Sequence, residues 1–171
     1  YMPFISMVKK AALHHHLGDL KFVVSTLGIS KLDDQRMVDP ELAGGALLDL
    51  GIYPINNAVI FADSKLTKIE SSMTPYETGV DESNTIVLTF ENGVIGLLAS
   101  SMNGILNPKT QLSYEKGRIE LDNIPNPSSF SIYDEMQELI ETIAVPQQIS
   151  GYEYQVLEMI ETINKGELEM P

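Results

Sequence analysis

The sequence of 171 residues contains no cysteine, so neither a disulfide nor a catalytic thiolate can contribute to its stability or chemistry. It is also poor in cations, because 24 acidic residues outnumber 11 lysines and arginines and give a formal net charge of −13. Binding to a nucleic-acid backbone requires a basic surface, so this composition argues against a nucleic-acid partner. The lack of cysteine is compatible with a cytoplasmic protein, and the cytoplasm is the location we expect.

Long apolar runs and phosphate-binding glycine loops are missing as well. No continuous apolar stretch approaches the roughly 20 residues of a membrane span, and we expect no membrane partner. Neither G-x-G-x-x-G nor G-x-x-x-x-G-K-[ST] occurs, so this chain alone is not expected to hold a dinucleotide in the usual way. The first residue is Tyr1 instead of methionine, which suggests a piece of a longer protein.

Helical periodicity of apolar residues predicts three helices, over residues 3–17, 46–62 and 152–164. Pro54 lies inside the second pattern, where it removes a backbone donor and clashes one turn back. We therefore expect a kink between Leu50 and Pro54. A polar loop over residues 33–40 precedes this helix.

Most of the remaining chain is typical of strands and tight turns. Residues 139–145 fit a helix or a strand, and their isoleucine, valine and threonine content favours a strand. Turn signals at residues 91–93 and 115–117 predict hairpins. The other expected strands cover residues 20–27, 66–78, 82–90, 94–101, 111–114, 118–121 and 130–133. This order predicts one α+β domain over residues 1–171, with an open, mostly antiparallel sheet.

The residues with the clearest chemical potential lie on the second expected helix. Asp49 and Tyr53 are four residues apart, so the carboxylate and the phenol share one face. Asn56 and Asn57 extend this polar strip along an otherwise apolar helix. Buried polar groups need partners, so the pair has two explanations: a hydrogen-bonded pair in the core, or a binding site.

The segment that contains this pair resembles a known family signature. Residues 43–53 read Ala-Gly-Gly-Ala-Leu-Leu-Asp-Leu-Gly-Ile-Tyr. They are similar to the Gly-Gly-Gly-Ala-Leu-x-Asp-x-Gly-x-His/Tyr stretch of the glucose–fructose oxidoreductase / inositol dehydrogenase / MocA (Gfo/Idh/MocA) family, with alanine in place of the first glycine. Two further segments resemble the start of the family's sheet and one of its hairpins, respectively: residues 18–20 (Gly-Asp-Leu) and residues 114–120 (Tyr-Glu-Lys-Gly-Arg-Ile-Glu).

The resemblance implies a fold and an activity. Members join an N-terminal Rossmann domain to a C-terminal domain like that of glyceraldehyde-3-phosphate dehydrogenase, with helices on one face of an open sheet. This chain would then be the substrate-binding and oligomerisation domain of an NAD(P)-dependent oxidoreductase that moves a hydride to or from a carbinol carbon of a sugar, polyol or diol. The cofactor-binding glycines and a catalytic lysine would belong to the missing Rossmann domain, so we expect this chain alone to be inactive.

The resemblance also implies roles for particular residues. Asp49 would orient substrate hydroxyls, and Tyr53 would give or relay a proton. Tyrosine at the His/Tyr position resembles the branch of dihydrodiol dehydrogenases and glucose–fructose oxidoreductase. Arg36, with Asn56 and Asn57, would contact substrate, although a loop arginine is also typical of a solvated surface.

Two alternatives to catalysis remain open at this stage: a dimerisation module and a redox-sensing module of the same fold. An open sheet with one uncovered face predicts a homo-oligomer that forms through that face. We expect no metal site, because the adjacent side chains of His14, His15 and His16 point in different directions and no spaced carboxylate completes a tetrahedral set.

Overall fold

The computed structural model describes residues 3–147, 149 and 151–167, and within these residues eight strands form one sheet. The strand order across the sheet is β2-β3-β4-β1-β5-β6-β7-β8. Neighbouring strands are antiparallel except for β1 and β4, which are parallel. The strands are β1 (Leu20–Gly28), β2 (Leu66–Pro75), β3 (Asp81–Phe90), β4 (Ile95–Ser101), β5 (Thr110–Tyr114), β6 (Gly117–Leu121), β7 (Ser129–Asp134) and β8 (Leu139–Ala144).

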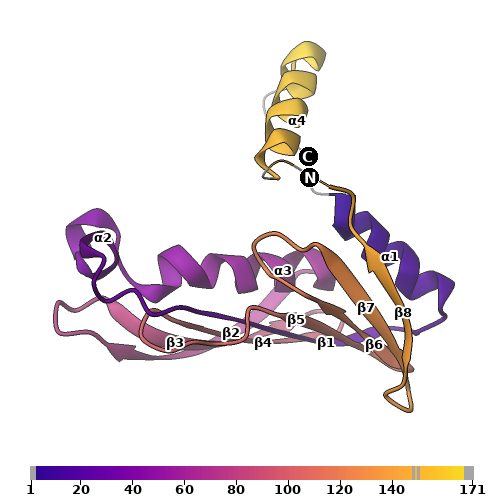
Figure 1. Ribbon diagram of the computed structural model, residues 1–171, viewed down its shortest axis with the longest axis horizontal. Helices are drawn as coiled ribbons and strands as arrows, with labels where there is room; N and C mark the ends of the chain where they lie inside the picture. The colour runs from indigo at the N-terminus through magenta and orange to yellow at the C-terminus, as the bar shows by residue number, and fades with distance from the viewer. Residues whose placement is uncertain (1–2, 148, 150, 168–171) are drawn as a thin grey trace.

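Helices α1 (Pro3–His14) and α3 (Ile52–Ala62) cover the same face of this sheet, as Figure 1 shows. The two helices contact each other through Phe4 of α1 and Phe61 of α3, whose ring centroids lie 6.5 Å apart. Both helices share one apolar core with inward residues of the strands, among them Val23 and Ile119, which are fully buried. The predicted α+β fold with helices on one face of an open, mostly antiparallel sheet is therefore confirmed, and the described residues contain no Rossmann fold.

Helix α4 (Tyr152–Lys165) differs from the other two, because it projects away from the sheet (Figure 1). It begins directly after Gly151, whose φ of +86° glycine adopts without strain. The expected polar loop at residues 33–40 also contains local helix, namely the single turn α2 (Gln35–Val38). Asp34 caps that turn by accepting a hydrogen bond from the Arg36 backbone N–H at 3.1 Å, a contact between near neighbours that apolar periodicity does not reveal.

The predicted kink is a wide helical turn. Residues Leu47–Gly51 form a π-helix, and the regular helix α3 begins at Ile52 with Pro54 in its first turn. A proline ring clashes with the carbonyl one turn earlier in a regular helix, and a wider turn gives that carbonyl room.

The stretch Pro40–Ala62 is, by length and composition alone, apolar enough to cross a membrane. Half of its most apolar 18-residue window is buried within the protein. Its inner side includes Ala58 and Phe61, which belong to the core between α3 and the sheet. Core helices commonly show this composition, so it gives little support for a membrane span.

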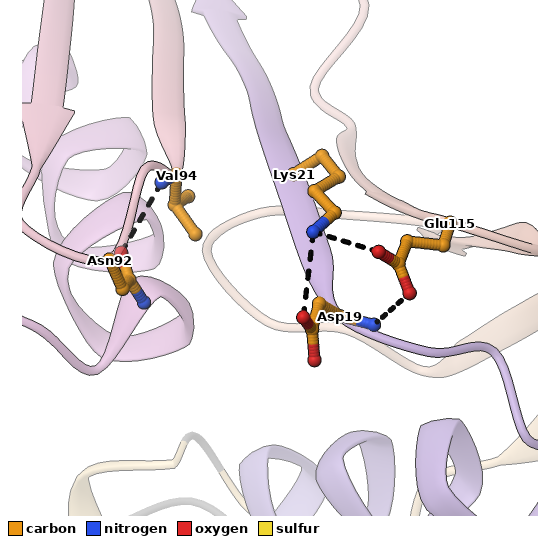
Figure 2. A network of polar contacts seen from close by, with 5 residues as sticks. All are labelled: Asp19, Lys21, Asn92, Val94 and Glu115. Atoms are coloured by element: carbon orange, nitrogen blue, oxygen red, sulfur yellow. Dashed lines mark hydrogen bonds and ion pairs between the residues drawn. The ribbon is translucent and has the colours of Figure 1, made fainter.

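Two of the motif-like segments contact each other (Figure 2). The Lys21 ammonium lies 2.9 Å from the Glu115 carboxylate, and the Asp19 backbone N–H donates to the same carboxylate at 3.2 Å. Gly18 has a φ of +81°, and a side chain there would collide with Glu115. These contacts connect the start of β1 to the turn between β5 and β6. In the turn between β3 and β4, the Val94 N–H donates a hydrogen bond to the Asn92 side chain.

Candidate functional site

Two glycines allow the chain to turn tightly into the motif helix. A Cβ atom on Gly44 would lie 2.6 Å from the Met37 carbonyl oxygen and 2.8 Å from that of Asp39. Gly45 has a φ of +110°, and a Cβ atom there would collide with the Asp81 carboxylate. That carboxylate accepts a hydrogen bond from the Leu47 N–H at 2.8 Å, which caps the helix start from strand β3.

The alanine that replaces the first signature glycine is strained. Ala43 adopts a left-handed conformation, with φ 55° and ψ 41°. A left-handed conformation costs an L-residue with a Cβ atom about 1–2 kcal/mol, whereas glycine adopts it freely. Position 43 therefore has the backbone conformation that glycine favours, although this sequence has alanine there.

The carboxylate of the signature is paired. The Arg36 guanidinium donates a hydrogen bond to Asp49 at 2.5 Å, and it reaches the motif from α2. The Asp49 side chain is 29% exposed and that of Arg36 is 49% exposed. The structure thus brings together two of the residues predicted from the sequence, and their charges compensate each other at the surface.

The phenol of Tyr53 is half-buried one turn further along. Burial is the main cause that raises its pKa above the ordinary value, and the neighbouring Tyr152 and Asp49 raise it further. A raised pKa keeps Tyr53 protonated at neutral pH, so it is suited to give a proton and poorly suited to take one.

Tyr53 lines a cavity of about 460 Å³. Four parts of the chain meet there: α1, α3, the loop between β6 and β7, and the start of α4. A cavity of this size is in the range that small-molecule ligands occupy. The lining residues are Phe4, Ile5, Tyr53, Asn56, Asn57, Ile60, Ile124, Pro125, Gly151, Tyr152 and Gln155.

The predicted site residues divide into two groups. Tyr53, Asn56 and Asn57 line the cavity, whereas Asp49 and Arg36 are not among its lining residues. Asn56 is exposed, so its amide is accessible to a ligand.

Asn57 has a second role in the packing of α3. It is only 7% exposed, and its amide donates to the Thr110 hydroxyl at 2.8 Å. Thr110 in turn shares a hydrogen bond of 2.7 Å with Ser25. These buried hydrogen bonds connect α3 to β5 and β1. The side-chain amide of Asn57 is therefore held in place by the fold.

Tyr152 and Gln155 are lining residues that the sequence did not indicate. Both belong to the first turn of α4, about 100 residues after Tyr53 in the sequence. Helical periodicity assigned them to a helix but gave no information on where that helix lies. Gly151 is a local signal for the start of this helix in the sequence. It does not indicate where the helix lies relative to α3.

The side chains of two of the three histidines make contacts of another kind. His15 Nε2 lies 3.2 Å from the Glu141 carboxylate, which joins the end of α1 to β8. The rings of His14 and His15 meet edge to face, with centroids 5.0 Å apart. In the part of the chain that the structure describes, no group of three or more metal-ligating side chains gathers.

Fold and cavity together define the class: an α+β domain with an open sheet, in which a helix preceded by two glycines presents the Tyr53 phenol to a cavity of small-molecule size. The chain belongs to the GFO/IDH/MocA C-terminal domain family, whose model matches residues 5–120. This confirms the resemblance inferred from residues 43–53, and it makes the chain part of a family of oxidoreductases.

Relatives with known activities agree with this class. Trans-1,2-dihydrobenzene-1,2-diol dehydrogenase of Sus scrofa is 29% identical over 178 residues, a match that covers 100% of this chain and 53% of that protein. The enzyme of the same name from Oryctolagus cuniculus is 34% identical over 120 residues, or 70% of this chain and 36% of the relative. The chain therefore spans about half the length of the relatives that it matches along its whole extent.

Solved structures show the same fold. Aldose-aldose oxidoreductase from Caulobacter crescentus, in a complex with glycerol, superposes with a TM-score of 0.79 at 22% identity over 95% of this chain and 50% of that one. A 3-ketoreductase from Actinomadura kijaniata, in a complex with NADP and TDP-benzene, gives a TM-score of 0.80 at 19% identity over 97% of this chain and 52% of the other.

Proposed function

We propose that this chain is the substrate-side domain of an NAD(P)-dependent oxidoreductase, which moves a hydride to or from the carbinol carbon of a sugar, polyol or diol. The observation that carries the proposal is the position of the Tyr53 phenol on the wall of the cavity, where burial raises its pKa and so favours the protonated form. Carbonyl reduction requires a proton at the oxygen as the hydride reaches the carbon, and a positioned phenol can supply it. The dehydrogenase relatives support the same assignment.

The residues of this chain divide the remaining work. Tyr53 would hold the proton that the substrate oxygen receives, while Asn56 would donate a hydrogen bond to a neighbouring hydroxyl. Asp49, held by Arg36 one helical turn before Tyr53, would orient a substrate group that extends beyond the cavity. NAD or NADP, bound by the other half of the protein, would supply or accept the hydride.

Among the three substrate classes, the cavity favours a cyclic diol. Its walls combine apolar side chains, among them Phe4, Ile60 and Pro125, with polar groups of Asn56 and Gln155. Such a lining suits a compact ring that is apolar on its faces and carries hydroxyls on one edge. The relatives that act on dihydrobenzene-diol support this choice.

Helix α4 supports the proposal of a missing Rossmann domain as the covalent partner of this one. Val156, Met159, Ile160 and Ile163 are between 51% and 63% exposed, although their spacing places them along one side of the helix. An apolar stripe of this kind needs a cover. The relatives are about twice as long as this chain, so we propose that their additional half supplies the cover and closes the cavity.

The uncovered face of the sheet supports a homo-oligomer. Val24, Val87 and Leu97 lie together across β1, β3 and β4 on this face, and Leu97 is 39% exposed. Because the helices cover the other face, we propose that a second copy covers this one. Leu97→Lys should convert the protein to a monomer in size-exclusion chromatography, and an unchanged elution volume would contradict this interface.

The test of the enzymatic role uses the complete protein that contains this chain. Tyr53→Phe should lower kcat for carbonyl reduction by about 10²–10⁴-fold and leave NAD(P) binding unchanged, because only the proton-donating hydroxyl is removed. Tyr133→Phe is the matched control. Tyr133, on β7, stacks against the Arg118 guanidinium and does not line the cavity. Unchanged turnover of the Tyr53 variant would overturn the proposal. Cofactor binding by the parent without any turnover would favour the redox-sensing alternative.

A further inference from the structure

Two buried polar side chains interrupt the apolar face of the sheet beneath the π-helix. The buried residues of β3 alternate along the strand: Asn84, Ile86, Leu88 and Phe90. Asn84 is the polar one among these four, and its cross-strand partner on β4 is Ser100, which is also buried. Burying an amide and a hydroxyl costs free energy unless both are hydrogen-bonded, whereas an aliphatic pair would continue the core. The polar pair therefore marks a place where the fold uses hydrogen bonds instead of apolar contact.

The Asn84 amide uses both of its hydrogens in this arrangement. It donates to the Asp81 carboxylate and to the Ser100 hydroxyl, each at 2.7 Å. A carboxylate only accepts, so the nitrogen of the amide must face Asp81. Ser100 accepts one of the amide hydrogens and donates its own to the Ala46 carbonyl at 3.4 Å. The chemistry of the groups thus fixes the direction of all three hydrogen bonds.

These side chains hold two backbone groups at the start of the π-helix. Asp81 accepts from the Leu47 N–H at 2.8 Å, and Ser100 donates to the carbonyl of the residue before it. Gly51 lies against the same hydroxyl, because a Cβ atom there would be 3.0 Å from Ser100 Oγ. Asp81, Asn84 and Ser100 therefore form a polar platform that fits this helical turn, and a glycine of the signature allows the close approach.

The wide turn affects the geometry of the candidate site. In it, the Ile52 N–H donates to the Leu47 carbonyl, which lies five residues back instead of the usual four. Such turns are rare within helices and occur frequently at functional sites. A change in the width of the turn rotates the residues inside it relative to those after it. Asp49 lies inside the turn and Tyr53 lies after it, so the turn sets the direction of the carboxylate relative to the phenol.

We propose that Asn84 is a positioning residue of the candidate site, because it orders the polar platform that keeps residues 47–51 in the wide turn. The platform thereby directs the Asp49 carboxylate relative to the Tyr53 phenol. This inference rests on the proposed function, since it concerns the geometry of the same site. Asn84 acts through the backbone of the turn and needs no contact with the substrate.

Tyr53 is held by other contacts than Asp49. It belongs to the regular helix α3, which the hydrogen bond between Asn57 and Thr110 connects to β5. The platform instead contacts the segment before α3. Loss of the platform should therefore displace Asp49 and leave Tyr53 in place.

Asn84→Leu in the complete protein tests the proposal, because it removes both donors and keeps an inward side chain like those of its neighbours on β3. KM for the substrate should rise about tenfold, the usual effect of losing one hydrogen bond to a charged group, while kcat changes less than about threefold. Ser83→Ala is the matched control. Ser83 makes a cross-strand hydrogen bond of 2.7 Å to Ser101, but adjacent residues of a strand point to opposite faces of the sheet. The control should leave both constants unchanged.

A double-mutant cycle with Asp49→Ala separates positioning from a general loss of structure. In the Asp49→Ala background, Asn84→Leu should change KM by less than about twofold, because the carboxylate that the platform directs is absent. A general disturbance of the cavity would instead multiply the two effects on KM. That result would overturn the role of Asn84.

Backbone amide hydrogen exchange in the complete protein tests the platform without any measurement of activity. Residues 46–52 should exchange at least about tenfold faster in Asn84→Leu and in Ser100→Ala than in the parent, because the turn loses its supports. Residues 86–90 of β3 should exchange at the parental rate and serve as the internal reference. Ser83→Ala should match the parent in both segments. Ser100→Ala removes a single hydroxyl, so this measurement still decides if Asn84→Leu does not fold.

The outcomes separate this inference from the proposed function. If Tyr53→Phe keeps its turnover, the proposed function fails, whatever the platform does. If Tyr53→Phe loses turnover while Asn84→Leu behaves like Ser83→Ala in KM and in exchange, the function stands and the role of Asn84 is overturned. A fall in kcat as large as the rise in KM also overturns it, because the platform would then support the whole site instead of directing Asp49.

Discussion

The Arg36 guanidinium lies 2.5 Å from the Asp49 carboxylate, so a residue of the preceding loop fixes the acid of the signature segment. The hydrogen bond to Asp49 is the main cause that raises the pKa of Arg36. Because both groups are partly exposed, the pair contributes little to stability, yet it decides where the carboxylate points. In this arrangement Arg36 is the residue that contacts the Asp49 carboxylate and holds it in place.

Arg36→Gln should therefore affect substrate binding more than stability. We expect the free energy of unfolding to fall by less than about 1 kcal/mol. In the complete protein, KM for the substrate should rise, because Asp49 loses its fixed orientation. Urea unfolding and steady-state kinetics measure the two effects, and Lys9→Gln, which breaks the surface pair with Asp63, is the control. A stability loss above about 2 kcal/mol would assign Arg36 a structural role instead.

Ala43→Gly should stabilise the protein. Ala43 has a φ of 55°, a conformation in which glycine avoids the cost of the Cβ atom. The greater freedom of glycine in the unfolded chain opposes part of this gain, so the net increase should be about 0.5–1 kcal/mol by urea unfolding. Ala58→Gly, in the buried middle of α3, should instead destabilise. A loss of stability in the Ala43 variant would show that the methyl group makes a contact that outweighs the strain.

Gly45→Ala should have the opposite effect. The φ of +110° and the collision of the new methyl group with Asp81 both oppose the substitution. We expect a loss of about 1–3 kcal/mol in the free energy of unfolding, together with weaker substrate binding because the helix start must shift. Gly93→Ala is the control, since Gly93 also has a positive φ but a Cβ atom there meets open space. Equal losses in the two variants would assign the effect to backbone conformation alone.

Alkaline pH should destabilise the protein through Tyr114, in addition to the general effects of high pH. Burial raises the pKa of Tyr114 to about 12, whereas the unfolded chain has the ordinary value near 10. The unfolded state therefore loses its proton first, so stability is complete below pH 10 and falls as the pH rises toward 12. The part due to Tyr114 should amount to about 2 kcal/mol.

Tyr114→Phe isolates this part, because phenylalanine does not titrate. Between pH 9 and pH 12, the free energy of unfolding measured with urea should therefore fall more steeply for the parent than for the variant. A difference that stays constant over this range would contradict a raised pKa for Tyr114 in the folded protein.

Local patterns in the sequence predicted the elements well. The eight strands and the helices α1, α3 and α4 fall in the segments that apolar periodicity indicated, including β8, where helix and strand patterns competed. Turn residues at 91–93 and 115–117 lie between antiparallel neighbours, as expected. These features depend on contacts between residues close in sequence, which a single sequence reveals.

Other features depend on distant contacts and could not be predicted. The parallel pairing of β1 with β4 joins segments about 70 residues apart, and no turn signal specifies it. The partner of Asn57, Thr110, is another such case, as is the arrival of Tyr152 at the Tyr53 cavity. The Asp49–Tyr53 spacing indicated a shared face, but the sequence could not show that Arg36 would hold the carboxylate.

The central position of β1 has a consequence for how this chain folds. Strands β2, β3 and β4 form one meander of hairpins, and strands β5 to β8 form a second. Each meander can assemble through short loops, but only β1 connects them, and it pairs with no strand next to it in the sequence. Closing these long loops is the slow kind of step in folding. A chain without residues 1–28 would keep both meanders but lack β1, the strand that joins them into one sheet.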